Sequence, residues 1–214
     1  MSRKITLRLG AAALMAAVLA GCAPKYAAYA SVRGDFRCLA PWRWKVVTDH
    51  EGEHYTDTTF IGPFDPKFYL GAPSLSVRWY RDYASHRLRD GSLEMYTGAD
   101  DYIRQTLREV YGPQSQLAQP IAQVLVSGIK AEHFVVLSPA PAPAGARWGV
   151  LTDPRTGKRF IPQKHAYVVA PVSDGFYVLI YPATDAGYAE HLAQFNTLVN
   201  TFFLMKDGPS GAAR

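Results

Sequence analysis

The stretch that decides the fold is Ala166-Tyr167-Val168-Val169-Ala170, followed shortly by Phe176-Tyr177-Val178-Leu179-Ile180-Tyr181. Both runs are rich in the β-branched, aliphatic and aromatic side chains that strands favour. Ser173-Asp174-Gly175 lies between them and has the composition of a tight turn. The two runs are therefore predicted to pair antiparallel and to form central strands of a sheet.

A helix is predicted directly after this pair. Thr184 and Asp185 have side chains suited to cap it. Apolar residues then recur every three or four positions, at Tyr188, Leu192, Phe195, Val199 and Phe202. This spacing places them on the one stripe of a helix that packs against a sheet. Residues 206–214 are predicted to form a flexible tail.

Further strands and one more helix are predicted upstream. Leu75, Val77 and Trp79 alternate with more polar residues, as a strand with two unlike faces requires. Other strands are expected over 36–47, 121–126, 132–137, 147–152 and 158–161. The second helix starts at Asp100 and places Ile103 and Leu107 on one stripe. Residues 50–59 are predicted to be a polar connection, and residues 139–143, with three prolines, an extended loop.

This pattern indicates the α+β class, a mostly antiparallel sheet flanked by two main helices. The chain also contains the segments Pro41-Trp42-Arg43-Trp44-Lys45-Val46, Ser127-Gly128-Ile129-Lys130-Ala131, Phe176-Tyr177-Val178-Leu179-Ile180-Tyr181-Pro182 and Leu198-Val199-Asn200-Thr201-Phe202. Together they resemble the PsbP-like family, which includes the extrinsic photosystem II subunit and many small bacterial envelope lipoproteins. The resemblance implies an α/β/α sandwich and a binding or assembly role rather than catalysis, and it transfers no functional residue.

The N-terminus predicts a bacterial lipoprotein. Residues 1–21 combine a basic start with an apolar run of about a dozen residues, as secretory signal peptides do. Leu19-Ala20-Gly21-Cys22 resembles the lipobox, which implies cleavage before Cys22 and acylation of that residue. Residues 22–34 are then a lipidated tether and 35–205 a single domain. Ala23, in place of an aspartate, favours the outer membrane, with the body facing the periplasm.

The charge balance argues against nucleic acid as a partner. The 214 residues carry a formal charge of +5, from 23 Lys and Arg against 18 Asp and Glu. Removal of the signal peptide takes away three basic residues and no acidic one, which leaves 20 against 18. Most of the excess positive charge lies in the export signal, so the mature protein is almost neutral. Its charge therefore gives no reason to expect nucleic-acid binding. An envelope protein or a glycan is the expected partner, besides the membrane itself.

Cys38 is the only thiol left in the body once Cys22 is acylated. It is interpreted as a small buried apolar residue, and the alternative is a nucleophile or an intermolecular disulfide.

One string has the form of a zinc-protease motif. His50-Glu51-Gly52-Glu53-His54 matches H-E-x-x-H, in which two histidines one helical turn apart bind zinc and the glutamate activates water. The motif requires a helix, and Gly52 together with the polar neighbours argues against one. A solvated acidic loop is the favoured interpretation. The alternatives are a metal-dependent hydrolase using this string, or a metal held by His50, His54 and Asp57.

The densest basic and aromatic stretch is a candidate anion or ligand patch. It contains Arg78, Arg81, Arg87 and Arg89, interleaved with Trp79, Tyr80 and Tyr83. Arginine forks beside aromatic faces suit phosphate or carboxylate groups. The favoured interpretation is an ordinary strand with one charged face, whose basic groups Asp82 and Asp90 partly neutralise. The nucleophile-elbow, P-loop and dinucleotide motifs are absent from the sequence, and no cofactor is predicted. The sequence thus favours a non-enzymatic module, with a carrier of a small apolar ligand between sheet and helix as a further alternative.

Overall fold

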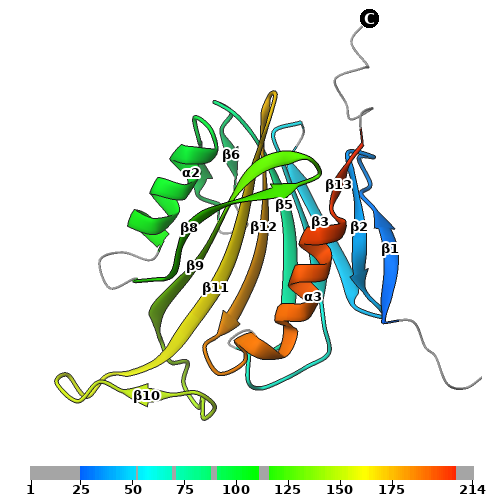
Figure 1. Cartoon of the computed structure of the whole chain (residues 1–214). Coiled ribbons are helices and arrows are strands. Elements are labelled where there is room, and N and C mark those ends of the chain that lie inside the picture. Colours follow the sequence, from blue (N-terminus) through cyan, green and yellow to red (C-terminus); the bar gives the residue numbers. More distant parts are fainter. Residues whose placement is uncertain (1–24, 52, 69–70, 88–90, 111–115, 206–214) are drawn as a thin grey trace, which may run out of the picture.

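A computed structural model describes residues 25–51, 53–68, 71–87, 91–110 and 116–205. The predicted signal peptide, Cys22, Arg89 and the predicted tail lie outside the described residues. An eight-stranded antiparallel sheet forms the centre of the molecule (Figure 1). Seven of its strands follow one another in the order β3 (Lys45–Glu51), β4 (Tyr55–Ile61), β5 (Ser74–Arg81), β12 (Gly175–Thr184), β11 (Arg159–Val172), β9 (Ile129–Pro141) and β8 (Gln116–Val126), and β10 (Leu151–Thr152) pairs with β11.

Smaller elements complete the fold. β1 (Tyr26–Ala30), β2 (Phe36–Pro41) and β13 (Phe203–Leu204) form a three-stranded sheet, and β6 (His86–Arg87) pairs with β7 (Leu93–Glu94). Helix α2 (Ala99–Gln105) continues into a π-helical turn, η1 (Thr106–Val110), and α3 (Tyr188–Thr201) follows β12. No helix in this described part of the chain is long and apolar enough to cross a membrane.

The predicted pair of central strands is confirmed. β11 and β12 pair from Gln163 with Thr184 to Val172 with Gly175, so that Ser173 and Asp174 alone form the turn between them. β12 is the fourth of the seven strands in the main path. All but one of its ten residues are buried, because both faces of the sheet are covered.

Each face of the sheet has its own core, and this is the α+β arrangement predicted from the sequence. On β12, alternate side chains point to opposite faces, as the pleat of a strand requires. Tyr177, Leu179 and Tyr181 join Phe195 and Leu198 of α3 in one core. The other core lies against α2 and contains Phe176, Val178, Ile180, Tyr102 and Ile103. The helices therefore lie on opposite faces of the sheet (Figure 1).

The N-terminal strands differ from the expected boundaries. Residues 36–47 form two strands in two different sheets, β2 and β3, with a turn at Arg43 between them. Part of the predicted tether, residues 26–30, is β1, and all five of its residues pair with β2. The aromatic ring of Tyr29 packs edge-on against Phe60 at 5.0 Å. This strand was not predicted because its sequence is rich in alanine, which has no preference for strands. It is a strand because it pairs with β2.

Two predicted loops are strands. Residues 50–59 do not form a polar connection, because β3 and β4 pair directly as a hairpin from Lys45 with Ile61 to Glu51 with Tyr55. Pro139 and Pro141 lie within β9, opposite Pro162 and Phe160 of β11. The predicted turn at Ser127 and Gly128 is confirmed, and both residues have positive φ angles, 53° and 78°, as a type I′ hairpin turn demands.

Candidate functional site

The His50–His54 string lies on the β3–β4 hairpin and not on a helix. His50 is in β3, opposite Thr56 of β4, and both His50 and His54 are exposed. Asp57 is buried, and its carboxylate accepts hydrogen bonds from Thr59 and Arg78. The zinc-protease arrangement, which needs both histidines one turn apart on a helix, is therefore not formed.

Among the described residues, Asp65, Glu190 and His191 form a group that could hold a metal ion, with ligand atoms within 4.8 Å of one another. His50, His54 and Asp57 do not form such a group. The ammonium group of Lys67 already lies 2.6 Å from the carboxylate of Glu190, and that hydrogen bond raises the pKa of Lys67. The Lys67 ammonium group thus already neutralises the Glu190 carboxylate that a metal ion would bind.

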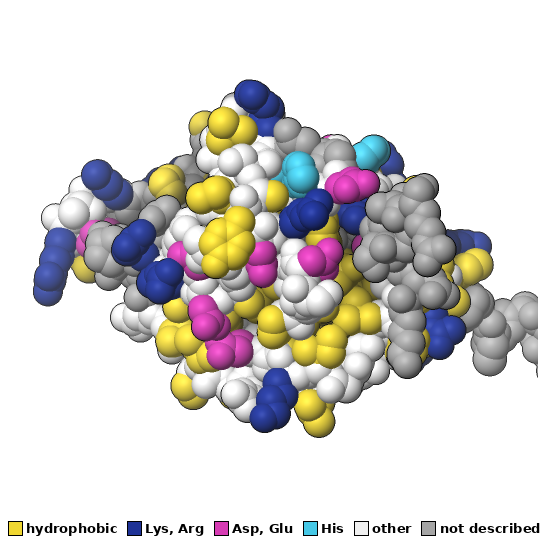
Figure 2. All heavy atoms as spheres, turned by 90° about the horizontal axis from the view of Figure 1, so that it is seen from above, with side chains coloured by type: hydrophobic (Ala, Val, Ile, Leu, Met, Phe, Trp, Pro, Cys, Tyr) yellow, Lys and Arg dark blue, Asp and Glu magenta, His cyan; other side chains and the backbone are white. Residues whose placement is uncertain are grey.

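The predicted arginine patch is divided between the two faces of the sheet. Arg78 points into the core that contains α2 and pairs with Asp57 at 3.1 Å. Trp79, its neighbour in sequence, points into the opposite core. Arg81 lies 3.8 Å from Glu53, and Arg87 donates a hydrogen bond to the carbonyl of Gly91. The end of the molecule seen from above shows basic and acidic side chains intermixed among those described (Figure 2).

Cys38 is buried on β2, with 4% of its surface exposed, and is a free cysteine. Burial raises the pKa of its thiol to about 12. Because the thiolate is the reactive form, this position suits a packed apolar residue, as the sequence indicates.

The predicted ligand space between helix and sheet is filled by side chains. Phe195 and Leu198 of α3 are almost completely buried against Leu179 and Tyr181 of β12. A packed interior of this kind is dense and leaves little room for a guest molecule.

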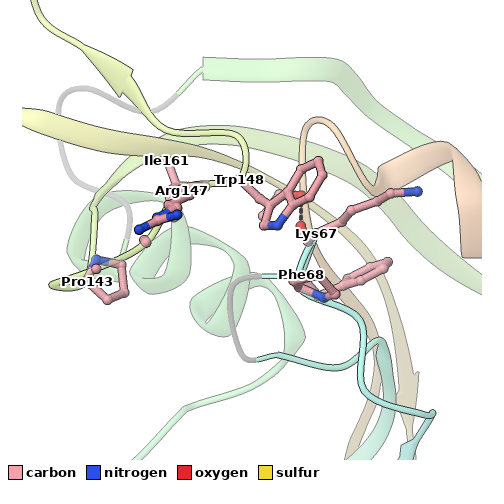
Figure 3. Close-up of a pocket in the computed structure, with 10 residues that line it drawn as sticks. Lys67, Phe68, Pro143, Arg147, Trp148 and Ile161 are labelled. Carbon is pink, nitrogen blue, oxygen red and sulfur yellow. Dashed lines mark hydrogen bonds between the residues drawn. The ribbon is translucent and has the colours of Figure 1, made fainter.

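A cavity opens at the end of the molecule where α3 begins. It has a volume of about 320 Å³ and lies between the loop that carries Lys67 and Phe68 and the loop at 143–148 (Figure 3). Figure 3 shows Trp148 between these two sides, with Arg147 and Pro143 on one side. The Lys67 ammonium points away from the cavity in this view, toward its partner Glu190.

Local hydrogen bonds hold the two loops in place. The Thr184 hydroxyl donates to the carbonyl of Lys67 at 2.7 Å and accepts from the amide of Gly187 at 3.1 Å, so that it joins β12, the Lys67 loop and the start of α3. On the other side, the Arg159 side chain of β11 donates to the carbonyl of Ala146. The cavity walls are thus attached to the ends of the central strands.

The cavity presents an aromatic face and an uncompensated positive charge. Trp148 is 60% exposed, although indole rings are usually buried. Arg147 is exposed, and it has no ion pair within the described ranges of the chain. A guanidinium group binds carboxylate or phosphate through paired hydrogen bonds, and an indole face packs against flat apolar surfaces. This pair of side chains is suited to a ligand that carries both an anionic group and a ring.

Sequence reasoning missed these residues. Lys67 and Trp148 are 81 positions apart, and neither belongs to a recognisable motif. The sequence predicts a strand over 147–152, but only Leu151–Thr152 forms one, so Trp148 lies in the loop before it. The available signal was the proline- and glycine-rich composition around this tryptophan.

A second, larger hollow lies on the other side of the molecule. It has a volume of about 650 Å³ and runs between α2 with η1 and the edge strand β8. Ile103, Leu107 and Ile121 line it, together with charged side chains at its rim.

No protein-family model and no curated protein matches the sequence. Solved structures to which the chain is similar include cyanobacterial PsbP (CyanoP) from Synechocystis sp. PCC 6803, with 12% identity, a TM-score of 0.49, and 86% of this chain and 96% of that chain covered. LpqN, involved in cell envelope biogenesis of Mycobacterium tuberculosis, has 11% identity and a TM-score of 0.42, over 84% of this chain and 90% of that one. A protein of unknown function from Pseudomonas aeruginosa has 12% identity and a TM-score of 0.42, over 81% and 92%. At these identities no function is transferred to this chain.

Proposed function

We propose that this protein is a lipid-anchored module of the bacterial cell envelope that binds an acidic glycan in the cavity beside Trp148 and catalyses no reaction. Acyl chains on Cys22 hold it in the outer membrane, and the body faces the periplasm. The observation that carries the proposal lies at the rim of a cavity, where the exposed Trp148 ring follows Arg147, whose guanidinium has no ion pair among the described residues.

The chemistry of this pair supports a sugar ligand. The C–H groups on one side of a sugar ring form an apolar surface that packs on an indole face, while Arg147 meets a carboxylate or phosphate on the same ligand. Envelope glycolipids and peptidoglycan both combine sugar rings with anionic groups. The two sources are distinguished by experiment rather than by the cavity itself.

A binding assay tests the cavity. The full-length protein, purified in detergent, is incubated with purified peptidoglycan sacculi in one arm and with lipopolysaccharide micelles in the other, and bound protein is measured. We expect binding in one arm that falls at least tenfold in Trp148→Ala and in Arg147→Glu. Tyr83→Ala, which removes an exposed aromatic ring outside the cavity lining, serves as the matched control. Equal binding by all variants, or binding in neither arm, contradicts the glycan proposal.

Fractionation and crosslinking in the native host test the anchor and the partner class. After a wash in 0.5 M NaCl, wild-type protein is expected in the outer-membrane fraction. Cys22→Ala, exported behind an ordinary cleavable signal peptide, is expected in the soluble periplasmic fraction. Equal distribution of the two forms overturns the anchor. If crosslinking instead recovers one specific protein, and its recovery is unaffected by Trp148→Ala, the cavity is not the binding site and the module is an adaptor for proteins.

A further inference from the structure

One end of the body gathers exposed aromatic and basic side chains close to the start of β1. We call it the anchor end. It is the lower end of the molecule in Figure 1, where β1 and α3 begin and β10 lies. Its exposed residues are Lys25, Trp42, Arg43, Lys45, Phe64, Lys67, Arg147 and Trp148.

A chain of contacts links these residues. The amide of Trp42 donates to the carbonyl of Lys25 at 3.0 Å, which joins the start of β1 to the β2–β3 turn. Trp44, in the same turn, packs on the ring of His191 at 5.5 Å, and Phe68 packs on His191 at 5.4 Å. Phe68 also lines the cavity of Figure 3. The start of the domain and the cavity are therefore joined by packed side chains.

The aromatic residues of the anchor end are exposed to an unusual degree. Phe64 is 79% exposed, Trp148 60% and Trp42 43%, whereas Trp79 in the core is 6% exposed. Folding gains nothing from leaving such large apolar rings in water. Tryptophan is the residue that favours the boundary between lipid headgroups and hydrocarbon, where its ring is shielded and its N–H remains hydrogen-bonded.

The charges of the anchor end are predominantly positive. Lys25, Arg43, Lys45 and Arg147 are exposed, and no carboxylate pairs with them in the part of the chain that the structure describes. The acidic groups nearby include Asp65, Glu190 and Asp185. Lys67 contacts the first two, through its backbone amide and its ammonium group, and Lys164 pairs with Asp185 at 3.6 Å. Unpaired basic groups are attracted to a surface of anionic lipids.

Backbone geometry places two of these side chains together. Arg43 has a φ of 64°, in the left-handed region that a residue with a side chain rarely adopts. The amide of Trp44 donates a hydrogen bond to the carbonyl of Pro41 at 3.3 Å. Trp42 and Arg43, both exposed, are the two central residues of this tight turn. Strained non-glycine positions of this kind recur at functional surfaces.

We propose that the anchor end docks on a bilayer that contains anionic phospholipids; this inference rests on the lipid anchor proposed above. Tyr26, the first residue of β1, follows Cys22 by four positions. Four residues span at most about 14 Å when fully extended. An acylated Cys22 therefore holds this end, rather than any other, against the lipid surface.

Vesicle sedimentation tests docking separately from the anchor. The mature chain, residues 22–214 with Cys22→Ala, has neither the signal peptide nor an acylation site. It is mixed with vesicles of phosphatidylglycerol and phosphatidylcholine in equal parts, or of phosphatidylcholine alone. We expect binding to the anionic vesicles, at least fivefold weaker binding to the neutral ones, and loss of binding in 0.5 M NaCl. Brominated lipids should quench tryptophan fluorescence in the bound state, and Trp42→Phe with Trp148→Phe should remove most of that quenching.

Two double variants with the same change in net charge identify the surface. Arg43→Glu with Lys45→Glu alters the anchor end and should lower anionic-vesicle binding at least fivefold. Arg81→Glu with Lys130→Glu alters exposed residues of β5 and β9 and should leave binding within twofold of the parent. Circular dichroism confirms that both fold. Equal loss in the two, equal binding to neutral vesicles, or no binding to anionic ones overturns the inference, and the anchor proposal stands if wild-type protein still fractionates with membranes.

Discussion

Asp57 and Arg78 occupy paired positions on β4 and β5, and the Nε of Arg78 lies 3.1 Å from Oδ2 of Asp57. The same carboxylate group accepts a hydrogen bond from the Thr59 hydroxyl at 2.9 Å. The pair lies on the sheet face that carries Tyr55 and Tyr80, whose rings are 5.1 Å apart. An ion pair thus forms the polar part of a surface that is otherwise packed with aromatic rings.

Removal of the charge at Asp57 should destabilise the fold. In Asp57→Asn the Arg78 guanidinium loses its anionic partner while 34% of its side chain is exposed. We expect a loss of about 2 kcal/mol, less than for a fully buried pair because water reaches the guanidinium. Urea unfolding measures it. The double variant Asp57→Asn with Arg78→Met should lose less than the two single variants added together, and strict additivity would show that the pair is not coupled.

Gly175 should tolerate no side chain. A Cβ at this position would lie 2.0 Å from the backbone carbonyl oxygen of Tyr80, on the neighbouring strand β5. Gly175→Ala must therefore push apart two central strands, and we expect a loss above about 3 kcal/mol in urea unfolding, or no folded protein. Gly34→Ala is the control, because Gly34 has a φ of +70° but open space around it. Its loss should be about 1 kcal/mol. Equal effects of the two substitutions would contradict this account.

Cys38 should be inert in the native protein. Burial raises the pKa of its thiol to about 12, so that almost no thiolate is present at pH 8. Iodoacetamide should label the native protein at Cys38 at least a hundredfold more slowly than the urea-unfolded protein, as measured by mass spectrometry of the peptide that contains it. Rapid labelling of the folded protein would show that the thiol is accessible and would reopen the nucleophile interpretation.

Stability should fall in mild acid because of His165. Burial lowers the pKa of this imidazole from 6.5 to about 4, so between these values the unfolded chain binds more protons than the folded one. The stabilising contribution of the neutral ring is complete above pH 6.5 and is lost as the pH falls toward 4. We expect His165→Gln to reduce the loss of stability between pH 7 and pH 4.5 by on the order of 1 kcal/mol.

Thermal unfolding at several pH values measures this contribution. His133 and His191 also have pKa values lowered by burial and act in the same direction, so part of the pH dependence remains in the variant. A variant whose stability falls with pH as steeply as that of the wild type would contradict a role for His165.

The elements that could be predicted were those whose own residues specify them. β11 and β12 follow from continuous apolar runs around Ser173 and Asp174, and α3 follows from the spacing of Tyr188, Phe195 and Phe202. Local composition is sufficient where a segment is buried on the face that its pattern indicates.

The missed elements depend on partners that are distant in sequence. β4 is rich in threonine and contains Asp57. As a buried strand it depends on β5, where Arg78 hydrogen-bonds to Asp57 and Ser76 to Thr59. β1 is a strand only because it pairs with β2. The cavity forms only because the loops that carry Lys67 and Trp148 lie close together at the ends of β11 and β12. Contacts of this kind leave no periodic signal in a single sequence.

The strand order determines when, during synthesis, the two larger sheets can be completed. β5 obtains its second neighbour only from β12, and β2 obtains its second neighbour from β13 at Phe203 and Leu204. A polypeptide that appears from its N-terminus during synthesis or transport therefore carries two open strand edges until its last quarter has arrived. The order of elements along the chain makes completion of both sheets a late event, and premature truncation anywhere before residue 175 leaves the two halves of the main sheet unjoined.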